Sequence, residues 1–242
     1  MIVSEEERRL EKRIRERFVK AFATWELLSD GDRVLVGLSG GKDSLCLLEM
    51  LGRRAKIDHP RFTVEAIHVR MEEVDYQTST VFLERFCSEL GVRLHIVTTS
   101  FPNTPHSHAK PACFLCSWQR RKQMFNLAQE LGCNKIALGH HQDDLLTTAL
   151  MNIFFQSRFE TMPACLQMDK MPLKIIRPLC LVHEADIARY AELRGYEKQV
   201  KRCPYEADTQ RNSMRQLLDT ITAENPEARH SLWNALLREQ KV

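Results

Sequence analysis

The sequence predicts an α/β fold in which a parallel, twisted sheet carries helices on both faces. Short β-branched runs alternate along the chain with helical segments of about ten or more residues, and this alternation is typical of βαβ units. Right-handed crossovers between parallel strands place the connecting helices on both faces. With a helix before the first strand and a helical extension after the last, the 242 residues form one large domain with helical additions.

The first predicted helix spans residues 4–28 and ends at Asp30-Gly31-Asp32. Its apolar residues recur every three or four positions and form one stripe along the helix. This stripe offers a surface for a homodimer. It comprises Leu10, Ile14, Phe18, Phe22 and Trp25.

The main part of the chain alternates between predicted strands and helices. The strands span 33–38, 63–69, 92–98, 135–139 and 173–176. The helices span 45–54, 80–90, 113–131, 143–155 and 184–193, and two more follow at 213–222 and 227–238. Two long loops, 99–112 and 156–171, interrupt the pattern, and such loops in a compact domain are usually functional. We divide the chain into an N-terminal basic helix (1–30), a main domain (31–200) and a C-terminal segment (201–242).

The composition excludes several classes of protein. Hydrophobic residues make up 43% and charged residues 28%, as in ordinary globular proteins. The sequence has no run of about 18 apolar residues and no apolar signal region at its start, so we expect neither a membrane span nor secretion. A cytoplasmic protein is the default, and paired cysteines there are more often metal ligands or catalytic thiols than structural disulfides.

A glycine-rich segment joins the first predicted strand to the next helix. It comprises Ser39, Gly40, Gly41, Lys42, Asp43 and Ser44, and we call it the phosphate loop. The two glycines let the backbone approach a ligand closely, and the helix that follows presents free N–H groups and the positive end of its dipole. Lys42 adds a positive charge, and Asp43 can hold a divalent cation between phosphate oxygens. The segment therefore predicts a phosphate site.

The spacing of this segment excludes two common phosphate loops. Only four residues separate Gly37 from Lys42, which does not fit a Walker A loop, and the dinucleotide fingerprint G-x-G-x-x-G is absent. The pattern S-G-G-x-D-S resembles the PP-loop of the N-type ATP pyrophosphatases. These enzymes cleave ATP between its α and β phosphates and adenylate a carbonyl oxygen.

Three cysteines are candidates for chemistry. Cys113 and Cys116 form a C-x-x-C at the start of a predicted helix, where a thiolate is favoured. Cys203 lies in a polar stretch between two helices. Zinc, an iron–sulfur cluster and a redox pair all remain open, and the nearby His106 and His108 fit a zinc site. Of the others, Cys165 lies in a loop, and four are expected in the core: Cys46, Cys87, Cys133 and Cys180.

The segment G-H-H-Q-D-D (139–144) ends a strand and begins a helix. Asp143 at a helix start is an N-cap by default, but this does not account for Gly139 or for a second aspartate. At the carboxyl end of a central strand, such a group can contact a nucleotide or a metal ion. The two histidines are equally consistent with packing and with function.

Basic residues gather in three places, although the formal net charge is only +3. Together they are able to form one patch for a nucleic-acid backbone, while a solvated surface is the simpler interpretation. One cluster lies on the first helix, the second is Arg120, Arg121 and Lys122, and the third includes Lys198, Lys201, Arg202, Arg211 and Arg215.

The order of these motifs resembles the family that makes 2-thiocytidine in tRNA, an iron–sulfur-dependent branch of the PP-loop enzymes. The resemblance covers residues 10–220. The motifs in order are the phosphate loop, the C-x-x-C, G-H-H-Q-D-D, R-F-E-T-M-P (158–163), I-R-P-L (176–179) and Cys203. The resemblance implies a Rossmann-like ATP pyrophosphatase fold. It also implies that the phosphate loop binds ATP with Mg²⁺, with Gly139 and Asp143 near the nucleotide.

The resemblance further implies that Cys113, Cys116 and Cys203 hold a [4Fe–4S] cluster with one iron open to sulfide. The enzyme adenylates the C2 carbonyl of a cytidine and replaces the oxygen with sulfur, releasing AMP and pyrophosphate. The implied partners are tRNA and a sulfide donor such as a cysteine desulfurase.

The sequence departs from this family in a few places. Gln142 stands where proteobacterial members often have arginine, and Pro204-Tyr205 replaces a further cysteine. Two other functions therefore stay open. One is a PP-loop enzyme acting on another tRNA nucleotide or a small molecule. The other is a non-catalytic regulator that binds ATP and a metal cluster.

Overall fold

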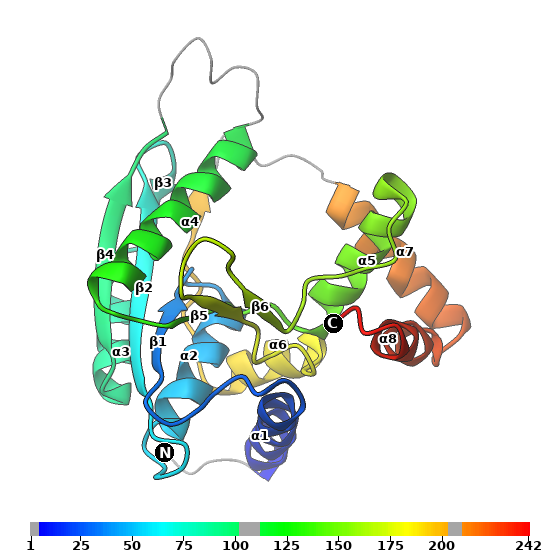
Figure 1. The fold of residues 1–242 in the computed structure, drawn as a ribbon, viewed down its shortest axis with the longest axis horizontal. Coiled ribbons are helices and arrows are strands. Elements are labelled where there is room, and N and C mark those ends of the chain that lie inside the picture. The colour runs from blue at the N-terminus through cyan, green and yellow to red at the C-terminus, as the bar shows by residue number, and fades with distance from the viewer. Residues whose placement is uncertain (1–4, 102–111, 203–209) are drawn as a thin grey trace.

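The computed structural model describes residues 5–101, 112–202 and 210–242. Within these residues, a six-stranded sheet in the order β4-β2-β1-β5-β7-β6 forms the centre of the molecule (Figure 1). Neighbouring strands are parallel except β6, which runs antiparallel to β7. The strands are β1 (Arg33–Gly37), β2 (Thr63–Met71), β4 (Arg93–Thr99), β5 (Lys135–Ala137), β6 (Cys165–Gln167) and β7 (Lys174–Ile176). A separate antiparallel pair joins β3 (Asp75–Tyr76) to β8 (Lys201–Arg202).

Helices lie on both faces of the sheet, as predicted (Figure 1). They are α1 (Glu5–Trp25), α2 (Lys42–Arg54), α3 (Val81–Leu90), α4 (Ala112–Glu130), α5 (Gln142–Gln156), α6 (Glu184–Leu193), α7 (Gln210–Glu224) and α8 (Ala228–Arg238). None of these helices is both long and apolar enough to cross a membrane.

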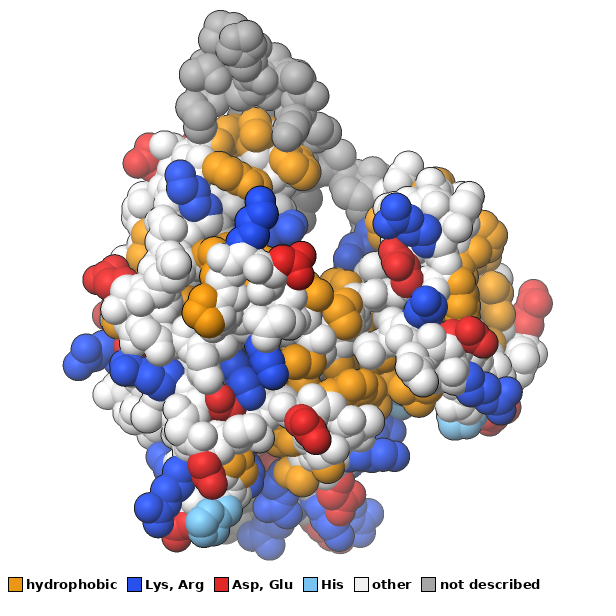
Figure 2. Space-filling view, in the orientation of Figure 1, with side chains coloured by type: hydrophobic (Ala, Val, Ile, Leu, Met, Phe, Trp, Pro, Cys, Tyr) orange, Lys and Arg blue, Asp and Glu red, His pale blue; other side chains and the backbone are white. Residues whose placement is uncertain are grey.

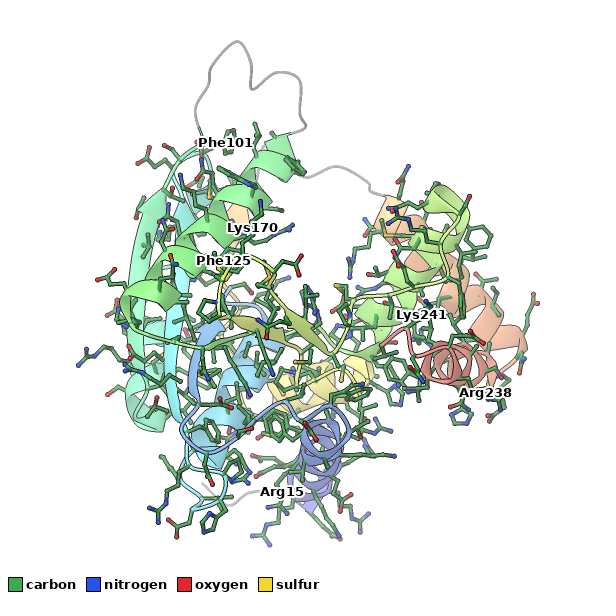
Figure 3. The ribbon with its side chains drawn as sticks, viewed as in Figure 1. Arg15, Phe101, Phe125, Lys170, Arg238 and Lys241 are labelled. Atoms are coloured by element: carbon green, nitrogen blue, oxygen red, sulfur yellow. The ribbon has the colours of Figure 1, made fainter. Side chains whose placement is uncertain are left out.

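The side-chain alternation of β1 explains the two layers. Val34 and Val36 point into the larger core, which α2, α3 and α6 complete, whereas Leu35 points into a smaller core beneath α4. Phe125 of α4 packs against this smaller core (Figure 3). The sequence of a strand that is buried on both faces is a continuous apolar run, and β1 has such a sequence.

The apolar stripe of α1 packs inside the chain. Leu10, Ile14 and Phe18 are at most 5% exposed, and α1 lies against α6. Arg13 and Arg17 secure this contact through ion pairs with Asp186 at 2.6 and 2.9 Å. The stripe therefore does not provide the dimer surface that the sequence suggested.

The predicted helices and long strands are present, but three short strands escaped prediction. β3 and β8 have two residues each and β6 has three, which is too short for a period-two pattern to show. β6 lies within the stretch 156–171 that was expected to be a loop, and it pairs with β7 from Cys165 to Gln167. Because β6 is antiparallel, the residues that precede it lie at the carboxyl edge of the sheet, beside the last residue of β7.

Candidate active site

The phosphate loop connects β1 to α2 at the carboxyl edge of the sheet. Gly40 has a φ of +82°, a conformation that side chains rarely adopt, so glycine is needed for this turn. The Ser39 N–H donates to Ser44 Oγ at 3.2 Å, and that hydroxyl donates to the Gly41 carbonyl at 2.9 Å. The two serines thus hold the loop in shape in front of the first turn of α2.

Three helix N-termini meet at this loop. α2 begins at Lys42, α5 at Gln142 and α6 at Glu184. The Asp143 carboxylate accepts a hydrogen bond from the Glu184 N–H at 2.7 Å, and Lys42 Nζ lies 3.0 Å from Glu184 Oε1. Because each N-terminus carries partial positive charge, the arrangement favours an anion with several negative charges.

Gly139, two residues after the end of β5, lies against the phosphate loop. A Cβ atom on this residue would lie 3.0 Å from the Asp43 carbonyl carbon and 3.1 Å from Ser44 N. Only glycine allows the two backbones to approach this closely. The structure therefore brings Gly139 and the phosphate loop together, as the sequence suggested.

Asp43 has one carboxylate oxygen that no hydrogen bond satisfies. Its Oδ1 atom is buried and makes no hydrogen bond, with Lys42 Nζ at 3.1 Å and His141 Nε2 at 3.8 Å. Burial lowers the pKa of Lys42, but the charges of Asp43 and Glu184 outweigh it and raise that pKa overall. Lys42 therefore stays protonated, and Asp43 offers a carboxylate oxygen that fits Mg²⁺.

Asp143 lies beside this centre with both carboxylate oxygens engaged. One accepts the Glu184 N–H, and the other pairs with Arg229 of α8. Asp143 therefore joins three helices in this structure, and its contact with a nucleotide stays a prediction.

Asp144 is the second aspartate of the segment, and it contacts His141 of its own segment and Arg211 of α7. Its Oδ2 lies 3.4 Å from His141 Nε2, and Arg211 Nη2 lies 2.8 Å from its Oδ1. Burial raises the pKa of Asp144, but His141 and Arg211 outweigh this effect and the pKa falls below its ordinary value. Asp144 is therefore ionised at neutral pH.

A cavity of about 150 Å³ opens next to the phosphate loop, between the ends of β1 and β2 and helix α4. Leu38, Val69 and Met124 give it apolar walls, which suit a flat base. Arg120 closes one side and donates from Nη2 to the Tyr76 hydroxyl at 3.3 Å. The sequence placed Arg120 in a surface cluster, but the structure places it in this cavity.

The C-x-x-C lies in the first turn of α4. Cys113 is exposed and Cys116 is half-buried. Cys116, Arg120 and Met124 follow one another at intervals of four residues, so they share one face of the helix. This face runs from the cysteine pair to the cavity. The spacing of three to four residues from Cys113 to Met124 would have been enough to predict it from the sequence.

The remaining candidate ligands, Cys203, His106 and His108, lie outside the described residues. Among the residues that the structure describes, no group of three metal ligands forms. The choice between zinc and an iron–sulfur cluster therefore does not follow from this geometry.

The four cysteines expected in the core are buried: Cys46, Cys87, Cys133 and Cys180. Burial raises the pKa of Cys87 and of Cys180 to about 12, so these thiols stay protonated. Cys165 is half-buried in β6. Cys113, in contrast, is exposed, as a reactive thiol has to be.

Two arginines of the third basic cluster are paired with acidic side chains. The exposed side chain of Arg15 on α1 points away from the sheet, and Figure 2 shows lysine and arginine side chains scattered among acidic ones on this face (Figure 3). Arg211 and Arg215 of α7 instead contact Asp144 and Glu184 beside the phosphate loop. The expectation of a single continuous basic patch is wrong for these two arginines.

Comparison with known proteins agrees with this site. A family model described as a PP-loop domain matches residues 7–221. The tRNA-cytidine(32) 2-sulfurtransferase of Aliivibrio salmonicida is 34% identical over 232 residues, which cover 94% of this chain and 75% of the relative. The same enzyme of Citrifermentans bemidjiense is 36% identical over 93% of this chain and 89% of its own length. The chain belongs to the tRNA-cytidine(32) 2-sulfurtransferase family.

A solved structure is similar to this member of the sulfurtransferase family along nearly its whole length. It is the U34-tRNA thiolase NcsA from Methanococcus maripaludis with its [4Fe-4S] cluster. The TM-score is 0.78 at 25% sequence identity, and the match covers 96% of this chain and 79% of NcsA. The family resemblance seen in the motifs and the PP-loop fold are confirmed. So is the enzyme class, an ATP-dependent tRNA sulfurtransferase.

Proposed function

We propose that this enzyme replaces the C2 oxygen of a cytidine in tRNA with sulfur, at position 32 as the names of its relatives state. The observation that carries the proposal is the shared face of α4. This face presents the exposed Cys113 at one end and lines the cavity beside the phosphate loop at the other. One helix thus links a site for sulfur chemistry to a site for ATP.

The residues of the phosphate loop divide the work of activation. Backbone N–H groups of the loop and Lys42 would hold the phosphates of ATP, and Asp43 would hold Mg²⁺, which would neutralise part of their charge. The apolar cavity takes the adenine base. Transfer of the adenylyl group to the C2 oxygen of cytidine releases pyrophosphate and makes that oxygen part of a good leaving group, AMP.

Cys113, Cys116 and Cys203 are the proposed ligands of a [4Fe–4S] cluster. Such a cluster would supply a site that binds the incoming sulfur. The support is the exposure of Cys113 at a helix start and the cluster in the similar NcsA structure. The proposed partners are tRNA and a sulfide donor such as a cysteine desulfurase, and the proposed location is the cytoplasm.

Thiolation of uridine 34 is the second candidate function, because NcsA is named a U34-tRNA thiolase. The relatives that are 34% and 36% identical are named for cytidine 32, and this favours cytidine. The two reactions share the ATP chemistry and differ only in the nucleotide that is thiolated.

An in vitro assay tests the proposal. The enzyme is reconstituted anaerobically with iron and sulfide, mixed with unmodified tRNA, ATP, Mg²⁺ and sulfide, and the nucleosides are analysed by mass spectrometry. We expect 2-thiocytidine from the wild type and none from Asp43→Ala, which lacks the cation ligand. Asp58→Ala is the matched control, because Asp58 is 86% exposed and follows the end of α2, outside the phosphate loop. Formation of 2-thiouridine, or full activity of Asp43→Ala, would contradict the proposal.

A further inference from the structure

Arg215 of α7 reaches the phosphate loop from the C-terminal segment. Its Nη2 atom lies 3.1 Å from Glu184 Oε2, while Lys42 Nζ lies 3.0 Å from Oε1 of the same carboxylate. One carboxylate therefore holds the loop lysine and Arg215 next to each other. We propose that Arg215 is a catalytic residue that contacts the pyrophosphate leaving group during adenylation, an inference that rests on the proposed function.

The contacts of Arg215 are weak enough for its guanidinium to leave Glu184 and bind a phosphate group. Its second contact, with Asp144 Oδ1, is long at 3.7 Å, whereas Arg211 holds the same oxygen at 2.8 Å. The Arg215 side chain is 39% exposed. A guanidinium so placed gives up a partly exposed carboxylate at little cost when a phosphate group with more charge arrives.

Other contacts keep α7 in place without Arg215. α7 packs along α5 (Figure 1), and Leu218 of α7 is only 3% exposed and belongs to the larger core. Arg211 ties the start of α7 to Asp144, and Arg229 of α8 ties the next helix to Asp143. The role of Arg215 is therefore separable from the anchoring of the helix.

Adenylation creates negative charge on the pyrophosphate leaving group, which Arg215 would contact. The C2 oxygen of cytidine attacks the α-phosphorus of ATP and forms a new P–O bond. The bond from that phosphorus to the bridging oxygen breaks, and its electron pair leaves on pyrophosphate. Nothing is oxidised or reduced. Cations fixed at the leaving group stabilise the transition state, and Arg215 is the cation placed beside Lys42 to do so.

Binding of AMP and of inorganic pyrophosphate tests this role directly. By calorimetry, Arg215→Gln should lose about tenfold in affinity for inorganic pyrophosphate with Mg²⁺ and keep its affinity for AMP. In single-turnover assays with tRNA, its rate of pyrophosphate release should fall about 100-fold, with KM for tRNA unchanged. Arg215→Lys should recover part of the rate, because it restores the charge.

Two further variants separate this role from folding and from net charge. Arg238→Gln removes a charge at the exposed end of α8 and should behave as the wild type (Figure 3). Arg211→Gln should lower the melting temperature by loosening α7, whereas Arg215→Gln should leave it nearly unchanged.

The outcomes distinguish the assignment of Arg215 from the proposed function. Wild-type affinity of Arg215→Gln for pyrophosphate, or a loss confined to KM for tRNA, would overturn the assignment. The second result would make Arg215 a contact to the RNA backbone. If the wild type makes no 2-thiocytidine while Arg215→Gln still loses pyrophosphate affinity, the function fails and the assignment stands.

Discussion

Gly139 and the phosphate loop touch through backbone atoms alone. Gly139→Ala would place a methyl group about 3 Å from Asp43 and Ser44, and neither backbone atom is able to move aside cheaply. We expect a loss of about 1–3 kcal/mol in the free energy of unfolding and a loss of ATP binding. Urea denaturation and calorimetry with ATP measure the two effects.

Gly41→Ala is the comparison for stability. Gly41 has a φ of −86°, and a Cβ there would lie 3.5 Å from Ser39 Oγ, which is ordinary contact. Its free energy of unfolding should change by less than about 0.5 kcal/mol. Equal stability of the two variants would show that the close approach at Gly139 does not matter.

The cysteine pair provides a second test at the scale of residues. Cys113→Ser should abolish iron binding and thiolation while leaving the fold intact, because its side chain is exposed. Iron content, visible absorption and circular dichroism measure these properties. Cys165→Ser is the matched control and should keep its iron. Full iron content in Cys113→Ser would remove this cysteine from the ligand set.

Local pattern predicted the residues of the site that neighbour one another in sequence. A turn, a strand end or a helix start marks the phosphate loop, Gly139 and the C-x-x-C in the sequence, and the structure brings the first two together. Glu184 was missed, because its contact with Lys42 spans 142 positions of sequence. Arg215 was misassigned to a surface patch for the same reason, since sequence shows charge but not what it faces.

At the scale of elements, α1 shows how a stripe of apolar residues is used. Phe18 is 1% exposed and faces the core, while the adjacent Val19 is 45% exposed. Phe18→Ala should lower the free energy of unfolding by about 3–5 kcal/mol, and Val19→Ala should change it by less than about 0.5 kcal/mol. Chemical denaturation checks both. A dominant effect of Val19→Ala would mean that the outer face of α1 is the packed one.

Elements with a long repeating pattern were predictable, and short ones were not. The period of three to four residues in α1 and the apolar run of β1 define these elements without any tertiary contact. β8 exists only because Asp75 and Tyr76 pair with Arg202 and Lys201, more than a hundred positions away. The joining of β3 to β8 is thus a property of the folded chain.

At the scale of the whole molecule, stability should depend on pH through His140. Burial and the charge of Arg177 lower the pKa of His140 from 6.5 to about 4. In the unfolded chain His140 therefore binds a proton below pH 6.5, whereas in the folded chain it binds one only near pH 4. This contribution is present above pH 6.5 and is lost as the pH falls toward 4.

The loss from His140 should reach about 3 kcal/mol by pH 4. Urea denaturation at pH 7, about 5.5 and about 4.5 measures it, and His140→Gln should show a shallower decline because it cannot bind the proton. Identical pH profiles for the wild type and this variant would mean that His140 is solvated in the folded protein.

The proposed activity of the protein is the thiolation of a cytidine in tRNA. Mass spectrometry of tRNA nucleosides, with fragments mapped to position 32, from cells with and without the gene tests it most directly. Selective loss of 2-thiocytidine at that position, restored by the wild-type gene and not by Asp43→Ala, is the result we predict. Unchanged 2-thiocytidine, or loss of a thiolated uridine instead, would contradict it.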